Sequence, residues 1–176
     1  ASFVLALQNH DVVGNDPHGR RLHQLTSPET QKAAAALILL YPSIPLLFMG
    51  EEFAADSPFR FFADFGDEHL REAVELGRAH EYPGHQGTPF ISPLDPRAFS
   101  ESKLPARGES SVFEWYRALI RLRKAWQSEG SLTPRGLAVN HFSEYGVFAF
   151  QYAQHGKSSR LVVARLRSLP KMFTLY

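Results

Sequence analysis

The chain has 176 residues, and its 19 Lys and Arg against 18 Asp and Glu give a net charge of +1, which argues against a dedicated nucleic-acid binder. Hydrophobic residues make up 44% and charged residues 21%, as in a globular protein and unlike a disordered one. The sequence has no cysteine and no apolar run of about 18 residues, which excludes disulfides, thiolate metal sites and a membrane-spanning helix. We therefore expect a cytoplasmic protein with neither nucleic-acid nor membrane partners.

The two ends of the sequence predict a piece of a longer protein. An apolar run at residues 3–7 follows Ala1 almost directly, without the basic segment of a signal peptide. Residues 169–176 are mainly apolar and end without a polar tail. We expect a fragment, or a protein truncated at both ends.

The first third of the sequence predicts a β-α-β unit. Residues 3–7 are continuously apolar, as in a strand of a parallel sheet that is covered on both faces, and residues 8–24 form a long polar loop. Ser27 caps a helix that ends before Pro42, because proline has no N–H to donate. Residues 44–49 are a second short apolar run, typical of another buried strand. This order implies a parallel sheet with a crossover helix.

The middle of the sequence predicts two more helices between irregular segments. The aromatic segment 59–65 favours core packing over a platform for a sugar ring. Asp67 caps a helix whose apolar face contains Leu70, Ala73, Val74 and Gly77. A connection rich in Pro and Gly follows at residues 83–108. The next helix opens with a capping box of Ser111 and Glu114, and its apolar face contains Trp115, Leu119, Leu122 and Trp126.

The last part of the sequence predicts an antiparallel sheet. Its strands are expected at residues 137–142, 145–152 and 161–166. Aromatic side chains alternate along the middle strand, as in a half-buried sheet, at Phe148, Phe150 and Tyr152.

Two polar clusters follow the two expected parallel strands. One is residues 8–11, which read Gln-Asn-His-Asp, and the other is Gly-Glu-Glu at residues 50–52. Parallel strands end at one edge of a sheet, so Asp11 and Glu51 or Glu52 could together bind or protonate a hydroxylated substrate. Turns after strands are commonly polar in any α/β protein, and that structural interpretation stays open on the residues alone.

Other charged residues near this edge favour structural roles. Arg20 and Arg21 are expected to be solvated. The spacing of His10, His18 and His23 matches no standard metal site, so no metal is expected.

Residues 3–11 resemble a signature stretch of the α-amylase superfamily of glycoside hydrolases, in which an apolar strand ends in Asn-His-Asp. Here the stretch reads Phe3-Val4-Leu5-Ala6-Leu7-Gln8-Asn9-His10-Asp11. The superfamily's eighth barrel strand resembles Ile44-Pro45-Leu46-Leu47-Phe48-Met49-Gly50-Glu51-Glu52.

Further blocks are similar to those of the malto-oligosyltrehalose trehalohydrolases, one family of this superfamily, over roughly residues 3–126. The blocks are Gln8-Asn9-His10-Asp11-x-Val13-Gly14-Asn15, Arg21-Leu22, Ser57-Pro58-Phe59-x-Phe61-Phe62-x-Asp64, Ala73-Val74-x-x-Gly77-Arg78 with Glu81, and Asp95-Pro96-x-x-Phe99-x-x-Ser102-Lys103-Leu104. Branching and debranching enzymes share the His-Asp pair but are not expected to carry all of these blocks together.

The resemblance implies an α/β fold, a (β/α)8 TIM barrel followed by an antiparallel β domain. Residues 1–129 would be the C-terminal portion of the catalytic barrel, with its last two strands and helices, and residues 130–176 an incomplete β-rich domain. The upstream half of the barrel would be the partner of this portion in the parent chain.

The resemblance also implies retaining hydrolysis of the α-1,4 bond next to the terminal trehalose of maltooligosyl-trehalose, an α-glucan substrate. The nucleophile and the acid/base of such enzymes are carboxyl groups about 5–5.5 Å apart. Asp11 matches a third carboxylate, which stabilises the transition state without attacking. The sugar site would be lined by Asn9, His10, Gly14 and Asn15, with Glu51 near the reducing-end trehalose and Glu52 structural. This chemistry requires no metal and no cofactor.

The chain departs from the family in two ways. The family's nucleophile and acid/base follow the fourth and fifth barrel strands, and no stretch of this sequence matches them; a complete barrel needs about 250 residues. Val12 stands where the family usually has Gln, which removes a polar contact. We therefore expect the isolated chain to be inactive.

Two alternatives remain open. The chain could be a non-catalytic carbohydrate-binding or interaction unit that works with a partner chain. It could also be a fragment of a glycogen branching or debranching enzyme.

Overall fold

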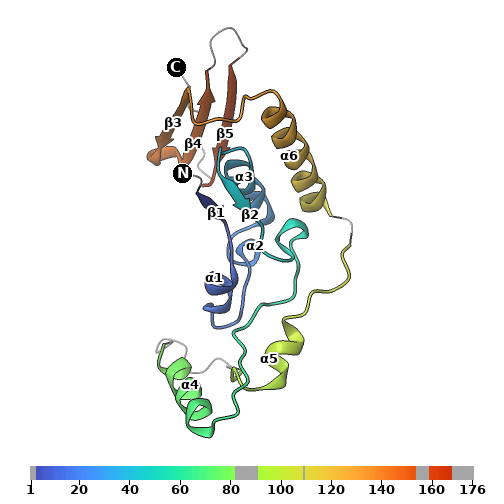
Figure 1. Cartoon of the computed structure of the whole chain (residues 1–176), viewed down its shortest axis with the longest axis vertical. Helices are drawn as coiled ribbons and strands as arrows, with labels where there is room; N and C mark the ends of the chain where they lie inside the picture. The colour runs from blue at the N-terminus through green and yellow to red at the C-terminus, as the bar shows by residue number, and fades with distance from the viewer. Residues whose placement is uncertain (1–2, 82–90, 109, 154–158, 168–176) are drawn as a thin grey trace. The chain divides into compact units, whose positions relative to one another are not determined.

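The computed structural model describes residues 3–81, 91–108, 110–153 and 159–167. Figure 1 shows the elements along the chain. They are β1 (Val4–Ala6), α1 (His10–Gly14), α2 (Leu22–Leu25), α3 (Pro28–Leu39), β2 (Ile44–Leu46), the 3-10 helix η1 (Glu51–Phe53), α4 (Glu68–Glu81), α5 (Pro96–Glu101), α6 (Ser111–Ser128), β3 (Leu137–Phe142), the 3-10 helix η3 (Ser143–Tyr145), β4 (Val147–Tyr152) and β5 (Arg160–Arg165).

The chain divides into two compact units. Unit 1 comprises the described residues within 1–7, 22–47 and 109–176, and unit 2 those within 8–21 and 48–108. The expected domain boundary between residues 129 and 130 falls inside unit 1 and stays a prediction. No helix of the described ranges is long and apolar enough to cross a bilayer.

The β-α-β unit predicted from the sequence is present in unit 1. β1 and β2 pair in parallel, with Val4 opposite Ile44 and Ala6 opposite Leu46, and α3 connects them. Both strands are shorter than predicted, and the prediction that they are buried on both faces is wrong. Val4, Ile44 and Leu46 are exposed, because no element among the described residues covers them. This leaves apolar strand surface open to another element.

The residues before α3 fold differently from the loop predicted at residues 8–24. The segment contains α1 and α2, and the side chain of Asn9 caps α1 locally. α3 itself begins as predicted, because the Oγ of Ser27 accepts a hydrogen bond from the backbone N–H of Thr30 at 3.1 Å.

The N-cap of helix α6 lies one residue earlier in the sequence than predicted. The Oγ of Ser110 accepts from the N–H of Phe113 at 3.1 Å, so Ser110 is the N-cap. Ser111 is instead the first helical residue, and its hydroxyl accepts from the Nζ of Lys32 at 2.9 Å. Glu114 binds Arg117 at 2.7 Å. The predicted capping box is therefore wrong, although the helix is confirmed.

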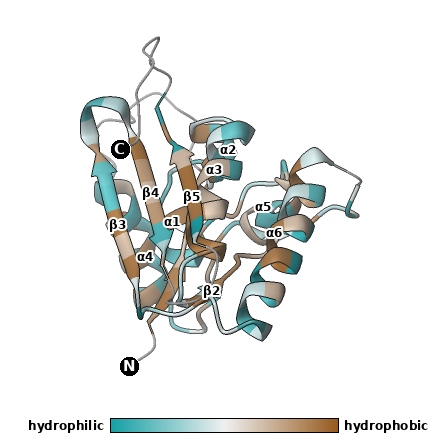
Figure 2. Ribbon diagram, turned by 90° about the horizontal axis from the view of Figure 1, so that it is seen from above, coloured by the Kyte–Doolittle hydropathy of each residue, from teal (hydrophilic) through white to brown (hydrophobic). Residues whose placement is uncertain are grey.

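The buried face of α6 agrees with the predicted one at Leu119 and Trp126 and differs from it at the other two predicted residues. Trp115 and Leu122 are exposed, whereas an arginine, Arg123, is buried. The buried face contains Val112, Tyr116, Leu119, Arg123 and Trp126. In Figure 2 the helix carries both brown, hydrophobic and teal, hydrophilic residues, as expected for a helix that packs on one side.

The antiparallel sheet of the last part is confirmed. β4 pairs with β3 on one side and with β5 on the other, with Leu137 opposite Tyr152 and Val147 opposite Arg165. The ring of Tyr152 packs against Trp126 of α6, with centroids 5.9 Å apart, and its hydroxyl donates to the carbonyl of Leu40 at 2.5 Å. Tyr152 therefore ties this sheet to the end of α3 within unit 1.

We expect the stability of the chain to fall above pH 10 because of Tyr152. Burial, with the neighbouring Tyr41, raises the pKa of Tyr152 to about 12, and Arg123 offsets part of this effect. The unfolded chain loses this proton near pH 10, so the stabilisation is complete below about pH 10 and is lost between about pH 10 and 12, amounting to about 2–3 kcal/mol. Urea denaturation across this range should show it. The control Tyr152→Phe should be less stable at neutral pH but lose less stability between pH 10 and 12; an unchanged slope would contradict the assignment.

Two helices of unit 2 differ from the predictions. Asp67 accepts from the N–H of Leu70 at 3.1 Å at the start of α4, as predicted, but none of the residues of α4 is buried, so its predicted apolar face does not pack. Helix α5, capped by Asp95 and started by Pro96, lies in the segment predicted to be irregular. Part of that segment, residues 83–90, falls outside the described residues.

Candidate functional site

The two predicted polar clusters meet in unit 2. The Nε2 of Gln8 donates to the Oε2 of Glu51 at 3.3 Å, and the two residues are only 2% and 1% exposed. The prediction that the segments after the two strands converge is therefore confirmed for these two side chains. In this chain the Glu51 carboxylate faces Gln8 instead of solvent, and its expected contact with sugar stays a prediction.

Helix α1 presents the candidate catalytic residue. The Oδ1 of Asn9 accepts from the N–H of Val12 at 2.8 Å and so starts the helix directly after Gln8. His10 and Asp11 occupy its first turn, where the Nε2 of His10 lies 3.1 Å from the Oδ1 of Asp11. Their side chains are 72% and 70% exposed. An exposed carboxylate paired with an imidazole can accept and donate hydrogen bonds to the hydroxyl groups of a ligand.

The other two candidate sugar-site residues end α1. Gly14 is buried, and a Cβ at this position would lie 3.7 Å from the backbone N of Phe61 and 3.8 Å from the ring of Phe59. Asn15 is exposed, and its Oδ1 accepts from the Nη1 of Arg78 at 2.8 Å. The structure thus brings five of the predicted residues, Asn9 to Asn15, onto one short helix and its cap.

The loop after α1 is closed by its own residues. Asp16 accepts from the backbone N–H groups of His18 and Arg20 at 3.0 and 2.9 Å and from the Arg20 guanidinium at 2.8 Å. Burial raises the pKa of Asp16, but the hydrogen bonds from Arg20 and His18 together lower it by more, so the pKa lies below its ordinary value. Gly19 has a φ of 65°, and a Cβ there would lie 2.6 Å from the carbonyl oxygen of Phe59, so only glycine fits.

Arg21 is fully buried, and the prediction that it is solvated is wrong. Its Nε donates to the carbonyl of Ser57 and its Nη1 to the carbonyl of Met49, both at 2.7 Å. Burial lowers the pKa of Arg21, and the carboxylates of Glu52 and Glu51 partly offset this. The Arg21 guanidinium thus links the end of the segment at residues 8–21 to Met49 and Ser57, which lie on either side of η1.

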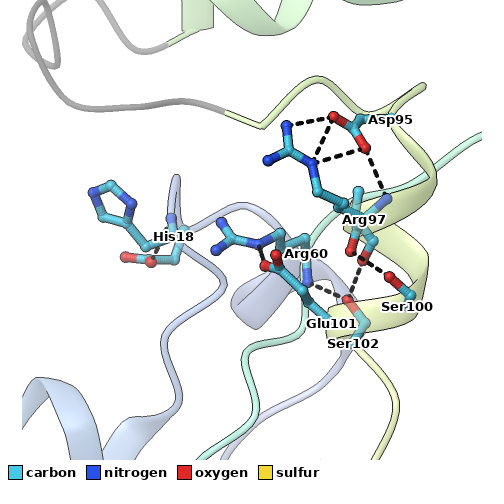
Figure 3. Close-up of polar contacts among 9 residues, drawn as sticks. His18, Arg60, Asp95, Arg97, Ser100, Glu101 and Ser102 are labelled. Carbon is cyan, nitrogen blue, oxygen red and sulfur yellow. Dashed lines mark hydrogen bonds and ion pairs between the residues drawn. The ribbon is translucent and has the colours of Figure 1, made fainter.

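Aromatic residues pack beneath this loop. Phe59 meets Phe48 edge to face, with centroids 5.0 Å apart, and also contacts Phe62 at 5.9 Å, so Phe59 packs as predicted for this segment. For Phe61 and Phe62 the prediction of core packing is wrong, because both side chains are exposed. Figure 3 shows how α5 holds the neighbouring backbone: the Oγ of Ser102 accepts from the N–H of Arg60 at 2.9 Å, and Arg60 binds Glu101 at 3.0 Å.

The structure adds two arginines to the residues expected from the sequence. Both arginines occur in blocks that resemble the family, but the residues alone predict a solvated Arg21 and no role for Arg78. Each binds partners far away in the chain, and no periodic pattern could have revealed this. Gly19 and Gly50 are the local sign in the sequence that the chain packs closely here. Both have positive φ, and a Cβ at either position would collide with a neighbouring segment.

Several known enzymes that share one name are similar in sequence to this chain. Malto-oligosyltrehalose trehalohydrolase of Saccharolobus solfataricus is 41% identical over 124 residues, which are 70% of this chain and 21% of that protein. The enzyme of the same name from Deinococcus radiodurans is 42% identical over 131 residues, again 70% of this chain and 22% of the relative. That of Arthrobacter ramosus is 36% identical over 155 residues, 84% of this chain and 26% of its own length. The chain thus spans between a fifth and about a quarter of the length of these relatives.

Solved structures agree on the fold. A Salmonella typhimurium protein assigned as an α-amylase is 33% identical and has a TM-score of 0.77, over 97% of this chain and 30% of its own. A variant of trehalulose synthase MutB has a TM-score of 0.57 at 21% identity, over 98% of this chain and 36% of its own, which shows the fold alone. No protein-family model matches the chain. The identity of 36–42% with these relatives shows that the chain belongs to the malto-oligosyltrehalose trehalohydrolase family of α-amylase-type glycoside hydrolases.

Proposed function

We propose that this chain supplies part of the sugar site of a retaining glycoside hydrolase. It would be the C-terminal portion of a (β/α)8 barrel whose complete form hydrolyses the α-1,4 bond next to the terminal trehalose of maltooligosyl-trehalose and releases trehalose. The observation that carries the proposal is the exposed pair of His10 and Asp11, with Nε2 and Oδ1 3.1 Å apart, in a chain of this family.

Asp11 acts on the sugar at the cleavage point without attacking it. Its carboxylate accepts hydrogen bonds from ring hydroxyls, and these bonds strengthen as the ring distorts toward an oxocarbenium-like transition state. His10 binds the same sugar, and the line of contacts continues through Asn9, Gly14 and Asn15. The nucleophile and the acid/base come from the upstream part of the barrel, and the reaction needs no metal or organic cofactor.

The segment that carries Asp11 is suited to this task because it is fastened at several points. Gln8 is held by Glu51 before α1, and Arg21 binds two backbone carbonyls after the loop. Catalytic groups need positions held within a fraction of an ångström, which requires such supporting contacts. Glu51 thereby supports the site through Gln8 whether or not it also touches sugar.

The upstream part of the barrel is the proposed partner of β1 and β2. Their exposed apolar side chains include Val4, Ile44 and Leu46. Strands of a parallel barrel are covered by neighbouring strands, by helices outside and by packed side chains inside. The open strand surface is therefore where we propose that the remaining barrel packs.

The isolated chain is expected to release no trehalose from maltotriosyl-trehalose. Trehalose is measured after incubation, with Asp11→Asn as the matched control and a complete trehalohydrolase as the positive one. Release well above that of Asp11→Asn would contradict the proposal that the principal acids lie elsewhere.

Calorimetry with maltooligosaccharides addresses the alternative of a binding unit: we expect little or no heat, whereas saturable binding would favour that alternative.

A further inference from the structure

Arg78 on α4 connects three segments of unit 2. Its Nη1 donates to the Oδ1 of Asn15 and to the Oε2 of Glu81, each at 2.8 Å. Its guanidinium carbon lies 3.9 Å from the centre of the Phe61 ring, close enough for a cation–π contact. Although it lies on a surface helix, its side chain is only 12% exposed.

This contact differs from the other contacts of α4. None of the residues of α4 is buried, so the helix gains little from apolar packing among the described residues. Arg71, two turns earlier on the same side of the helix, binds the nearby Asp64 and the carbonyl of Phe65 at the longer distances of 3.5 and 3.3 Å. Arg78 reaches instead across 63 positions of the sequence to the end of α1.

The chemistry of the pair settles the orientation of the Asn15 amide. A guanidinium has only donors, so the end of the amide that meets Arg78 must be the carbonyl oxygen. The amide nitrogen, a donor, is then directed away from Arg78. Arg78 therefore favours the orientation in which the amide oxygen of Asn15 faces the guanidinium.

We propose that Arg78 is a positioning residue of the sugar site, which fixes Asn15 so that its amide N–H groups donate to a hydroxyl oxygen of the bound glucan. This inference rests on the proposed function for the identity of the ligand, but the orienting contact itself does not. Phe61 restrains the guanidinium plane, and Glu81 neutralises its charge, so that Arg78 holds the amide without competing for the sugar.

The contact can be tested on this chain without any ligand. The sequence has three asparagines, Asn9, Asn15 and Asn140. With asparagine selectively labelled with nitrogen-15, Arg78→Met should shift the side-chain amide pair of Asn15 and leave the other two pairs in place. The control Arg71→Met, on the same helix, should leave all three in place. An unmoved Asn15 pair would overturn the inference, whatever the enzyme's activity.

The role in sugar binding is tested by a double-mutant cycle in the longer enzyme that contains this chain. Arg78→Met and Asn15→Ala should each lower kcat/KM for maltotriosyl-trehalose about tenfold, mainly through KM, and the double variant should fall no further than either one, because Arg78 acts through Asn15. A hundredfold fall in the double variant would mean that Arg78 supports the fold independently, and an unchanged single variant would also overturn the inference.

A second variant separates orientation from anchoring. Asn15→Asp keeps an acceptor for Arg78 but replaces the donor end with an oxygen, so activity should fall about tenfold while the thermal midpoint is maintained. If the unaltered enzyme releases no trehalose, the proposed function fails, and the amide resonances still decide whether Arg78 orients Asn15.

Discussion

Replacing Asp11 by Asn in the longer enzyme should lower kcat by roughly a hundred- to a thousandfold while KM changes little. Hydrogen bonds to the sugar that strengthen in the transition state are worth several kcal/mol, and about 1.4 kcal/mol corresponds to a factor of ten in rate. Asparagine keeps the shape of the side chain but loses its negative charge and one acceptor. Because the lost interaction forms mainly in the transition state, the defect should appear in kcat.

The measurement is steady-state release of trehalose from maltotriosyl-trehalose. Asp64→Asn is the matched control: it is the same chemical change in unit 2, at a carboxylate whose side chain is 97% exposed and outside α1. It should leave kcat and KM within about twofold. A large rise in KM with unchanged kcat for Asp11→Asn would show that Asp11 only binds substrate, and the role proposed for it would be wrong.

The position of this site could be predicted because it follows from strand order. Residues 3–7 and 44–49 are short apolar runs on either side of a capped helix, which implies parallel strands and places the residues after them at one edge. The contact of Gln8 with Glu51 agrees with that inference. The roles of Asp11 and its neighbours came only from resemblance to a family, since polar residues follow strands in many proteins for structural reasons.

The supporting arginines could not be predicted, for a physical reason. Arg21 is buried because two backbone carbonyls, those of Met49 and Ser57, accept its hydrogen bonds. Backbone acceptors leave no trace in the sequence, and a charged residue is by default expected at the surface. Arg78 is similarly held by a partner 63 positions away.

Helix α6 illustrates the same limit for packing. Its apolar residues allow two overlapping faces, both of which contain Leu119 and Trp126, because Trp115 and Leu122 are as hydrophobic as the residues that are buried. The observed face includes Arg123, which a hydrophobic pattern rejects. The carbonyl groups that Arg123 meets explain how this face can include a charged residue.

Those carbonyl groups lie where α3 ends and the chain turns into β2. The guanidinium of Arg123 donates to the carbonyls of Leu39 and Tyr41 at 2.6 and 2.9 Å, and also to that of Ser43. The last carbonyls of a helix have no partner within the helix, and a buried carbonyl without one is costly. Burial lowers the pKa of Arg123, which the neighbouring Tyr152 partly offsets.

Arg123→Met should therefore lower the free energy of unfolding of this chain by about 3 kcal/mol or more, because each buried carbonyl left without a donor costs about 1–3 kcal/mol. Arg123→Lys should recover only part of this, since one ammonium group cannot match the planar fork that reaches three carbonyls. Urea denaturation measures both. Arg121→Met is the matched control on the same helix, where the residue is exposed, and should change stability by less than about 0.5 kcal/mol. Equal losses at the two positions would mean that the bonds of Arg123 to the end of α3 contribute nothing specific to the stability of unit 1.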